Sequence, residues 1–450
     1  MQVAMARYLP IKAPRQEAVW TAKMRTIALL AALLAAGVTG AGYGAYGIYG
    51  GLFALAASYA LVPLLIVMAT ALTWPLDRIG KGLIVRKAWA KLALFPNVKI
   101  IGITGSYGKT TMKEAVAAVL RERYVVLASP ASVNTPVGIA RLILEKLDAS
   151  TEIFVVEMGA HRLGDIRGLC AITRPDIAVV TGINEAHLER FGSIERTRVA
   201  KFEIADCARP GAALVLNADD KRIREEYGRH SAGKKVAFYS ASKHPLAKYE
   251  TANILWSKDG LETSFELKDK DGVRYRLSVP LVGGYAPGTV AGAVEVAERC
   301  GMTEGEITRG VAMIRPVAHR LEPFMASGNI LVIDDSYNGN VDGAREAMRV
   351  LARFPERRKV YCTPGLVETG SAAHAVHEGL GMQLAGIADM VILIRNGATD
   401  SMRKGLETAG FGTARILAFE TSGEAHAALP GILRDGDVIL FQNDWPDNYF

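Results

Sequence analysis

The chain has 450 residues, half of them hydrophobic, and a formal net charge of +7. This length is too great for one ordinary domain and suggests two or three. The positive charge is concentrated in residues 1–25 (net +4) and residues 77–99 (net +5), so the remaining chain is slightly acidic and gives no argument for nucleic-acid binding. The four cysteines are far apart and have no spacing typical of metal ligands or redox pairs.

An uncharged apolar stretch comes first. No charged residue occurs from Thr26 to Leu76, which is long enough for two membrane crossings of about 20 residues each. Glycines between Gly37 and Gly51 mark the expected turn. A secretory signal peptide has one short apolar region and fits less well, and a buried core hairpin is the soluble alternative. Basic flanks on both sides place both chain ends in the cytoplasm and favour contact with anionic inner-leaflet lipids. We therefore expect a two-pass protein of the cytoplasmic membrane.

The residues after the hairpin change in character. Residues 77–97 predict a basic juxtamembrane helix or linker that ends near Pro96. Short apolar runs then alternate with helical segments, which is typical of parallel strands joined by crossover helices. The strand candidates are residues 98–103, 124–127, 153–156, 177–180, 213–216 and 236–239. A period of two between residues 253 and 282 predicts a small antiparallel insertion, and two helices are expected after it, at residues 287–300 and 304–314.

A second alternating block predicts a separate, smaller α/β domain with strands near residues 330–333, 359–362, 390–394 and 437–441. The expected fold class is α/β, with a central P-loop-type parallel sheet domain and a C-terminal Rossmann-like domain behind a two-helix transmembrane hairpin. The expected segments are a basic cytoplasmic N-terminus (1–25), the hairpin (26–76), the juxtamembrane linker (77–97), the central domain (98–320) and the C-terminal domain (321–450).

The first strand of the central domain runs into a glycine loop. Glycines let backbone N–H groups close around phosphate oxygens, and the helix that starts near Met112 adds the positive end of its dipole. Lys109 is expected to pair with the β and γ phosphates of ATP, and the Thr110 hydroxyl to reach Mg²⁺. Residue 103 is Ile rather than Gly, so the strict phosphate-loop spacing is not met, and a glycine turn without a ligand is the alternative. The expected nucleotide-binding residues here are Gly105, Ser106, Tyr107, Gly108, Lys109, Thr110 and Thr111.

Three polar residues downstream are further candidates. Glu157 ends a strand, at the edge where α/β sheets bind ligands. His187 follows the strand at residues 177–180, and Lys201 lies in the next helical segment. Each also has an ordinary interpretation, as a solvent-facing charge, a helix cap and one half of a surface ion pair, respectively.

Taken together, these segments resemble the Mur ligases, which join an amino acid or dipeptide to cell-wall precursors. The resemblance runs from about Val98 to the C-terminus, and Asp335-Ser336-Tyr337-Asn338 favours the branch that adds D-alanyl-D-alanine. The motifs that carry it are TGSYGKTT from Thr104, VVEMGA from Val155, TRPDIAVVTGINEAHLERFGS from Thr173, LVLNADD from Leu214, HRLE from His319 and DDSYNGN from Asp334.

The resemblance implies metal ligands and a modified lysine. Thr110 and Glu157 would help to hold Mg²⁺ near the γ-phosphate, and His187 would hold a second Mg²⁺. Lys201 matches the lysine that the family carbamylates, which converts a cationic amine into an anionic oxygen ligand suited to a hard cation. Asn134 matches an asparagine near the transferred phosphate.

The resemblance also assigns residues to the second domain and implies the reaction. Arg320 matches an interdomain arginine that contacts ATP phosphates, and Asp335 and Tyr337 match residues that close over the nucleotide. A carboxylate of a peptidoglycan precursor would attack the γ-phosphorus of ATP and form an acyl phosphate. The amine of an amino acid or dipeptide would then attack that carbonyl and release phosphate.

The chain also departs from the family pattern. The hairpin stands where the family has a domain that binds the uridine-diphosphate sugar. We therefore expect the acceptor to be presented at the membrane, in lipid-linked form. The alternative is that the hairpin only tethers the enzyme and that the acceptor is soluble. Ala286 and Thr289 replace two asparagines near the adenine, which leaves nucleotide preference open. Gln442-Asn443-Asp444 replaces a Lys-Gly-Ser segment, which leaves recognition of the amine open. A membrane-anchored poly-γ-glutamate-type ligase and a degenerate nucleotide-binding scaffold are the alternative functions.

Overall fold

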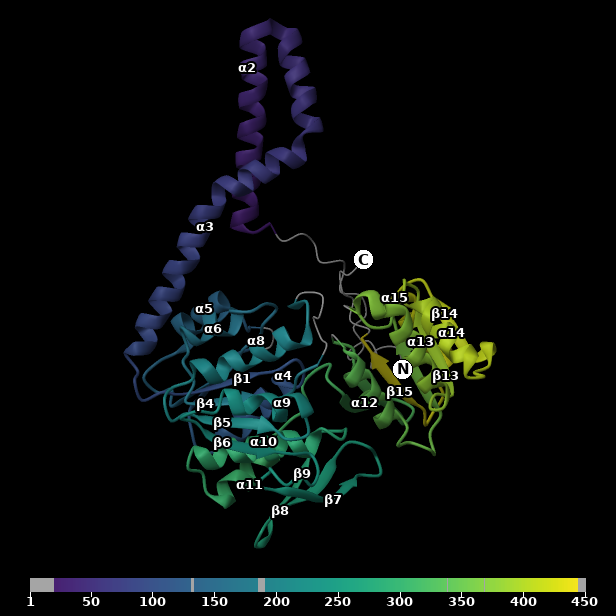
Figure 1. Ribbon diagram of the computed structural model, residues 1–450. Coiled ribbons are helices and arrows are strands. Elements are labelled where there is room, and N and C mark those ends of the chain that lie inside the picture. Colours follow the sequence, from purple (N-terminus) through teal and green to yellow (C-terminus); the bar gives the residue numbers. More distant parts are fainter. Residues whose placement is uncertain (1–19, 131–132, 185–190, 338, 368, 444–450) are drawn as a thin grey trace. The chain divides into compact units, whose positions relative to one another are not determined.

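The computed structural model describes residues 20–130, 133–184, 191–337, 339–367 and 369–443. Its contacts divide the described chain into two compact units, with the boundary between Ala90 and Lys91. The first unit is helical, and the second contains two six-stranded sheets and one three-stranded sheet (Figure 1). The predicted α/β class is confirmed.

The helical unit is an apolar hairpin built from α2 (Ala22–Ala60) and α3 (Val62–Ala93), although the last three residues of α3 belong to the second unit. α2 breaks at Tyr46 and Gly47, inside the glycine-rich stretch where the turn was expected, and Gly47 has a φ of +62°. The two arms of the hairpin lie on either side of this break, and they approach closely at glycines of α2, because a Cβ on Gly50 would lie 2.3 Å from the carbonyl oxygen of Gly42. Both helices are long and apolar enough to cross a membrane.

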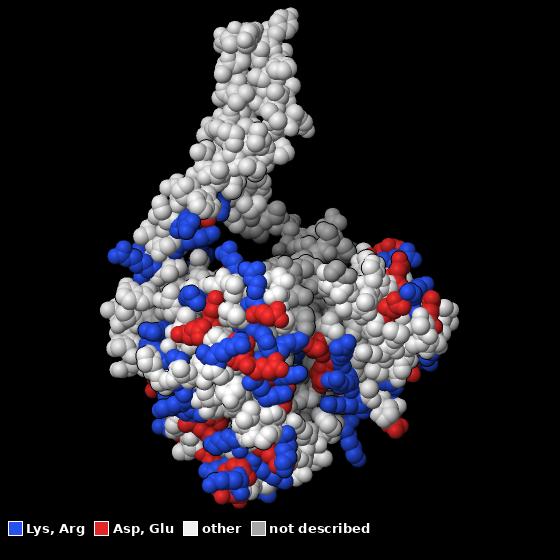
Figure 2. All heavy atoms as spheres, viewed as in Figure 1, with Lys and Arg blue, Asp and Glu red and all other residues white. Residues whose placement is uncertain are grey.

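Charged side chains are confined to the base of the hairpin. Asp77 pairs there with Lys23 at 3.0 Å and with Lys81 at 2.8 Å. The upper part of the hairpin has no charged side chain on the face seen in Figure 2. The hairpin is therefore uncharged from Thr26 to Leu76 and has ion pairs only at its base.

The central sheet is entirely parallel, with the strand order β2-β3-β1-β4-β5-β6. Its strands are β1 (Lys99–Thr104), β2 (Val126–Ala128), β3 (Ile153–Glu157), β4 (Ile177–Val180), β5 (Ala213–Asn217) and β6 (Lys235–Tyr239). The inner strands read as continuous runs of Val and Ile because helices cover both faces of such a sheet. All strands point the same way, so the residues that end β1, β3 and β4 meet at one edge.

Helices pack on this sheet in two groups. α4 (Lys109–Leu120), α10 (Ala286–Arg299) and α11 (Glu304–Ala312) share one hydrophobic core with the sheet. α6 (Asp165–Cys170) and α8 (Ile194–Cys207) pack against each other, and α8 contacts β1 and β4. The other helices are α5 (Pro136–Lys146) and α9 (Lys221–Glu226).

The predicted antiparallel insertion is confirmed as the sheet β7 (Glu250–Trp256), β8 (Thr263–Asp269) and β9 (Gly272–Val279). Tyr249, Phe265 and Tyr275 are buried in the core that α4 and α10 also share. The insertion therefore extends the central domain and forms no core of its own.

The second six-stranded sheet has the order β10-β11-β15-β12-β13-β14, and only β10 is antiparallel. Its strands are β10 (Glu322–Ala326), β11 (Ile330–Asp335), β12 (Lys359–Thr363), β13 (Met390–Ile394), β14 (Ile416–Phe419) and β15 (Val438–Gln442). α12 (Val341–Leu351), α13 (Ala373–Ala385) and α14 (Thr399–Thr408) share one core, and α15 (Ser422–Ile432) belongs to another. The two edge strands, β10 and β14, were not predicted.

Candidate active site

The glycine loop joins β1 to α4 and has the backbone geometry expected of a phosphate loop. Gly105 and Gly108 have φ values of +154° and +72°, a region that favours glycine. A Cβ on Gly105 would lie 2.1 Å from Thr181 Oγ1, so the loop also needs glycine for space. The Ser106 N–H donates to the Gly182 carbonyl at 2.7 Å, which ties the loop to the end of β4.

Tyr107 fixes the outer side of the loop. Its hydroxyl donates to Asp220 Oδ2 at 3.3 Å, and its ring occupies the space that a side chain at Gly182 would need. Asp220 also accepts the Ile183 N–H at 2.6 Å and caps α9. Asp220, the last residue of the LVLNADD motif, is therefore a structural support for the glycine loop.

Glu157 lies beside the first turn of α4. The Thr110 hydroxyl donates to Glu157 Oε2 at 2.9 Å, and Asn134 Nδ2 donates to Oε1 at 3.4 Å. The backbone N–H of Glu157 donates to Ser129 Oγ at 3.0 Å. Three of the predicted residues, from three different segments, are thus joined through one buried carboxylate whose oxygen atoms are suited to Mg²⁺.

Lys201 is almost completely buried in α8, which contradicts the interpretation as half of a surface ion pair. Its Nζ donates to the Ala160 carbonyl at 3.4 Å and lies 5.5 Å from the centre of the Phe191 ring. Burial, reinforced by the positive charge of Lys109, lowers the pKa of Lys201 to about 7. A large fraction of this lysine is therefore a neutral amine near pH 7.

Lys109 is partly buried at the start of α4 and donates to the Ser106 carbonyl at 3.3 Å. Desolvation lowers its pKa, Glu157 opposes that change, and Arg320 adds to it. Arg320 therefore lies within electrostatic range of the phosphate loop, although it comes from the start of the C-terminal segment.

Arg320 lies between two residues with positive φ angles. Its neighbours His319 and Leu321 have φ values of +62° and +47°, where residues other than glycine are strained. The guanidinium lies over the ring of Tyr337, 4.3 Å from its centre. Burial raises the pKa of Asp335 to about 7 against the opposing effect of Arg320, and Asp335 accepts the Leu321 N–H at 3.2 Å. Arg320 at the predicted domain boundary thus forms one group with Asp335 and Tyr337 of the C-terminal domain.

His187 and Asn338 lie outside the described residues. Ala286 is fully buried in the first turn of α10, and Thr289 is buried one turn further on. Gln442 ends β15, and Asn443 follows it, with its Nδ2 donating to the Gly365 carbonyl at 2.6 Å.

Sequence reasoning missed two residues that the structure places in the site. Lys113 is fully buried in α4, and its Nζ lies 3.9 Å from Glu157 Oε2. Asn184, after β4, donates to Asp342 Oδ2 of α12 at 3.0 Å. The signal for Lys113 was its position four residues after Lys109, which places both lysines on the same side of one helix.

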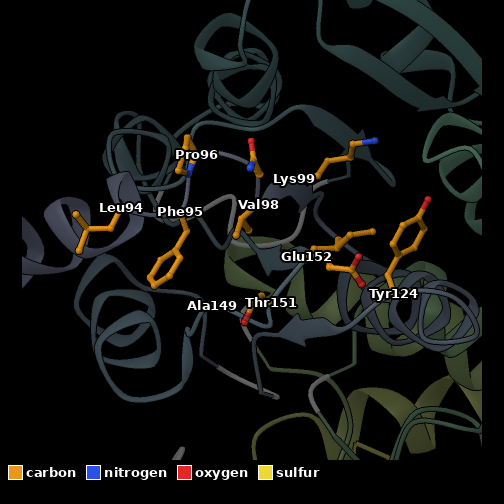
Figure 3. A pocket seen from close by; sticks show the side chains of 11 residues that line it. Leu94, Phe95, Pro96, Val98, Lys99, Tyr124, Ala149, Thr151 and Glu152 are labelled. Carbon is orange, nitrogen blue, oxygen red and sulfur yellow. The ribbon is translucent and has the colours of Figure 1, made fainter.

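A cavity of about 410 Å³ lies at the opposite edge of the central sheet (Figure 3). It is lined by Phe95, Lys99, Tyr124 and Glu152, among others. Lys99 starts β1, so roughly 17–20 Å of strand separates the cavity from the phosphate loop. The Tyr124 hydroxyl and the Glu152 carboxylate already bond to backbone groups of the fold. This cavity is not part of the nucleotide site.

Both α/β domains of the chain match the domains of a known enzyme family. The Mur ligase middle domain matches residues 103–293, and the Mur ligase glutamate ligase domain matches residues 319–442. A UDP-N-acetylmuramoyl-tripeptide–D-alanyl-D-alanine ligase from Mycobacterium tuberculosis is 30% identical over 396 residues, which cover 81% of this chain and 75% of the relative. The chain belongs to the Mur ligase family. It is an ATP-dependent amide ligase.

Two further relatives of this Mur ligase support the assignment. The ligase of the same name from Escherichia coli is 29% identical over 283 residues, covering 63% of this chain and 61% of the relative. The crystal structure of MurF from Thermotoga maritima in complex with ADP superposes with a TM-score of 0.71 at 26% identity, over 81% of this chain and 80% of that one. The confirmed part of the prediction is thus the family, the fold and the use of ATP.

Proposed function

We propose that this Mur ligase joins D-alanyl-D-alanine, or a similar dipeptide or amino acid, to the peptide of a peptidoglycan precursor. The observation that carries the proposal is the set of Lys109, Thr110, Glu157 and Asn134 at one sheet edge, together with relatives named for that reaction. Asp334 and Asp335, which open the segment that favoured this branch in the sequence, end β11, and Tyr337 of the same segment lies against Arg320.

The chain's own residues supply phosphate binding. Backbone N–H groups of the loop, the start of α4 and the Lys109 ammonium offer positive charge to the β and γ phosphates. Charge spreads over the oxygens of the transferring phosphoryl group, so preorganised donors lower the barrier. Asn134, which bonds to Glu157 at the same place, orients toward the transferred group in this proposal.

The donors also fit Mg²⁺. A threonine hydroxyl and a carboxylate are hard oxygen ligands of the kind this ion prefers, and His187 is the proposed ligand of a second ion. When bound, Mg²⁺ neutralises phosphate charge as the acyl phosphate forms.

A carbamate on Lys201 would complete the set. Its formation joins the neutral amine to the carbon of CO₂ and releases one proton to solvent, so it requires a lysine with a lowered pKa. Burial and the pKa of about 7 meet this requirement. The resulting anion would offset the positive charge of Lys109 and provide oxygen ligands.

The hairpin is proposed to span the cytoplasmic membrane twice. Tyr46 stands 21 positions after Arg25, the last charged residue before the turn. At 1.5 Å per residue this is about 32 Å, close to the hydrocarbon thickness of about 30 Å. Tyr43, Tyr46 and Tyr49 are exposed at the tip, and Trp20 and Trp74 at the base. Aromatic side chains at both ends are typical of membrane interfaces.

The test is product formation by the purified full-length protein in detergent micelles with ATP. The acceptors are UDP-N-acetylmuramoyl-tripeptide and its lipid-linked counterpart, and the amines are D-alanyl-D-alanine, D-alanine, L-alanine and L-glutamate. We expect ADP release coupled to amide formation with the dipeptide. Extension of a glutamate chain instead would favour the poly-γ-glutamate alternative, and nucleotide binding without any product would favour the scaffold.

A further inference from the structure

Lys113 is a buried cation that the proposed reaction does not use. Its side chain is 0% exposed in α4, four residues after Lys109. The Nζ donates to the Ser129 carbonyl at 2.6 Å, lies 3.0 Å from Glu114 Oε1, and lies 3.9 Å from Glu157 Oε2. A buried ammonium is costly unless it is paired, so these three partners explain why it is tolerated.

Lys113 lies close to the same carboxylate that binds the Thr110 hydroxyl. Thr110 and Lys113 both face the same oxygen, Oε2, from successive turns of α4. Ser129 links Lys113 to Glu157, because its carbonyl accepts from Lys113 and its hydroxyl accepts from the Glu157 N–H. Glu157 itself is only 3% exposed. The Glu157 carboxylate thus lies beside a cation that solvent does not reach.

The charges around Glu157 do not favour a divalent cation on its own. Lys109, Lys113 and Arg320 are all within electrostatic range of this single carboxylate. Glu114 and Asp335 act on Lys113 and Arg320, so these cations are already balanced when Glu157 is counted. Mg²⁺ arriving alone would add uncompensated positive charge at a buried position, where Coulomb interactions are strong. Mg²⁺ arriving with a triphosphate brings its own negative charge, and the repulsion is offset.

We propose that Lys113 is a positioning residue whose fixed charge keeps Glu157 from binding a divalent cation until nucleotide phosphates are present. The inference rests on the proposed role of Glu157 as a metal ligand. It implies that the metal enters as the nucleotide complex and that free Mg²⁺ does not occupy the site beforehand. Loss of Lys113 should therefore strengthen binding of the free metal, a change opposite to what structural damage would cause.

The experiment measures Mn²⁺ binding to the full-length protein in detergent micelles by electron paramagnetic resonance, with and without a non-hydrolysable ATP analogue. Wild type should bind Mn²⁺ tightly only with the nucleotide. Lys113→Met should bind free Mn²⁺ at least about tenfold more tightly than wild type, because a positive charge near the ligand is gone. Lys113→Arg should restore the wild-type behaviour, and Lys113→Met combined with Glu157→Gln should lose the gain.

A second variant decides the question if Lys113→Met does not fold. Glu114 is a partly exposed partner of Lys113, so Glu114→Gln should be well tolerated and should leave Lys113 with less counter-charge. Free Mn²⁺ binding should then weaken severalfold. Unchanged or weaker binding in folded Lys113→Met, or unchanged or tighter binding in Glu114→Gln, would overturn the inference. Nucleotide-dependent Mn²⁺ binding that survives Glu157→Gln would overturn it too, by removing the metal role of Glu157 in the proposed function.

Discussion

The hairpin and the α/β core use the same apolar residue types in opposite ways. In the hairpin, Phe53 and Tyr59 are 77% and 84% exposed, whereas Phe154 in β3 is 0% exposed. The core also buries charged groups, including Lys113, Glu157 and Lys201, while the hairpin confines its charges to the base. One region exposes apolar side chains along its length, and the other buries both apolar and charged side chains. Changes in one should therefore leave the function of the other intact.

The largest expected effect is on the core alone. Lys109→Ala removes the cation at the carboxyl end of β1 and should lower the rate of amide formation by about 10²–10³-fold, because it removes a contact to the transferring phosphate. Membrane association should not change. Lys99→Ala is the matched control, since Lys99 stands at the amino end of the same strand and should leave the rate within about twofold. Near wild-type amide formation by Lys109→Ala would contradict the phosphate-loop assignment.

Lys201 tests whether a buried lysine in the core acts as a carbamate. Lys201→Ala and Lys201→Arg should each lower the rate by about 10²-fold or more, because both lack an anionic metal ligand. Added formate or acetate should partly rescue Lys201→Ala, whose cavity can admit a short carboxylate, and should not rescue Lys201→Arg. An active Lys201→Arg enzyme would show that the lysine only fills space.

The pH dependence of Lys201 follows from its pKa of about 7, lowered mainly by burial. Below that pH the amine is protonated and cannot react with CO₂, and above it the amine is neutral. Enzyme depleted of CO₂ should therefore regain activity on addition of CO₂ about tenfold faster at pH 8 than at pH 6. Equal recovery at both values would mean that the amine is not the reacting group.

The sequence was sufficient for the features that depend on local pattern. The inner strands, the glycine loop and the apolar hairpin each have a strong local signal, and the structure contains all three. β10 was missed because it is a short edge strand that contains Pro323. β14 has four residues, as β4 does, but it lacks the run of Ile and Val that marks β4 in the sequence. Lys113 was missed because burial of a lysine depends on Ser129 and Glu157, which only the folded sheet brings to it.

Removing the hairpin tests whether the α/β core keeps its activity without it. The compact unit that starts at Lys91 is expected to fold without residues 1–90. On a soluble nucleotide-linked acceptor, its rate should stay within about twofold of the full-length rate. On a lipid-linked acceptor in micelles, it should fall by about tenfold or more, because confinement to the same surface raises the effective concentration. The loss of rate on each acceptor is measured side by side, and equal losses would mean that the hairpin supports the fold of the core.

The smallest effect should come from packing inside the hairpin. Gly50→Ala places a Cβ 2.3 Å from the Gly42 carbonyl oxygen, so the arms must separate, whereas Gly44→Ala meets open space. Close approach through small residues is what holds apolar helices together when lipid surrounds them. We expect Gly50→Ala to lower the free energy of unfolding in a titration with sodium dodecyl sulfate by about 1–3 kcal/mol. Gly44→Ala should raise it by up to about 1 kcal/mol, since alanine is the better helix former. Neither should alter ATP turnover with a soluble acceptor, and equal unfolding of the two variants would remove the glycine contact as a source of stability.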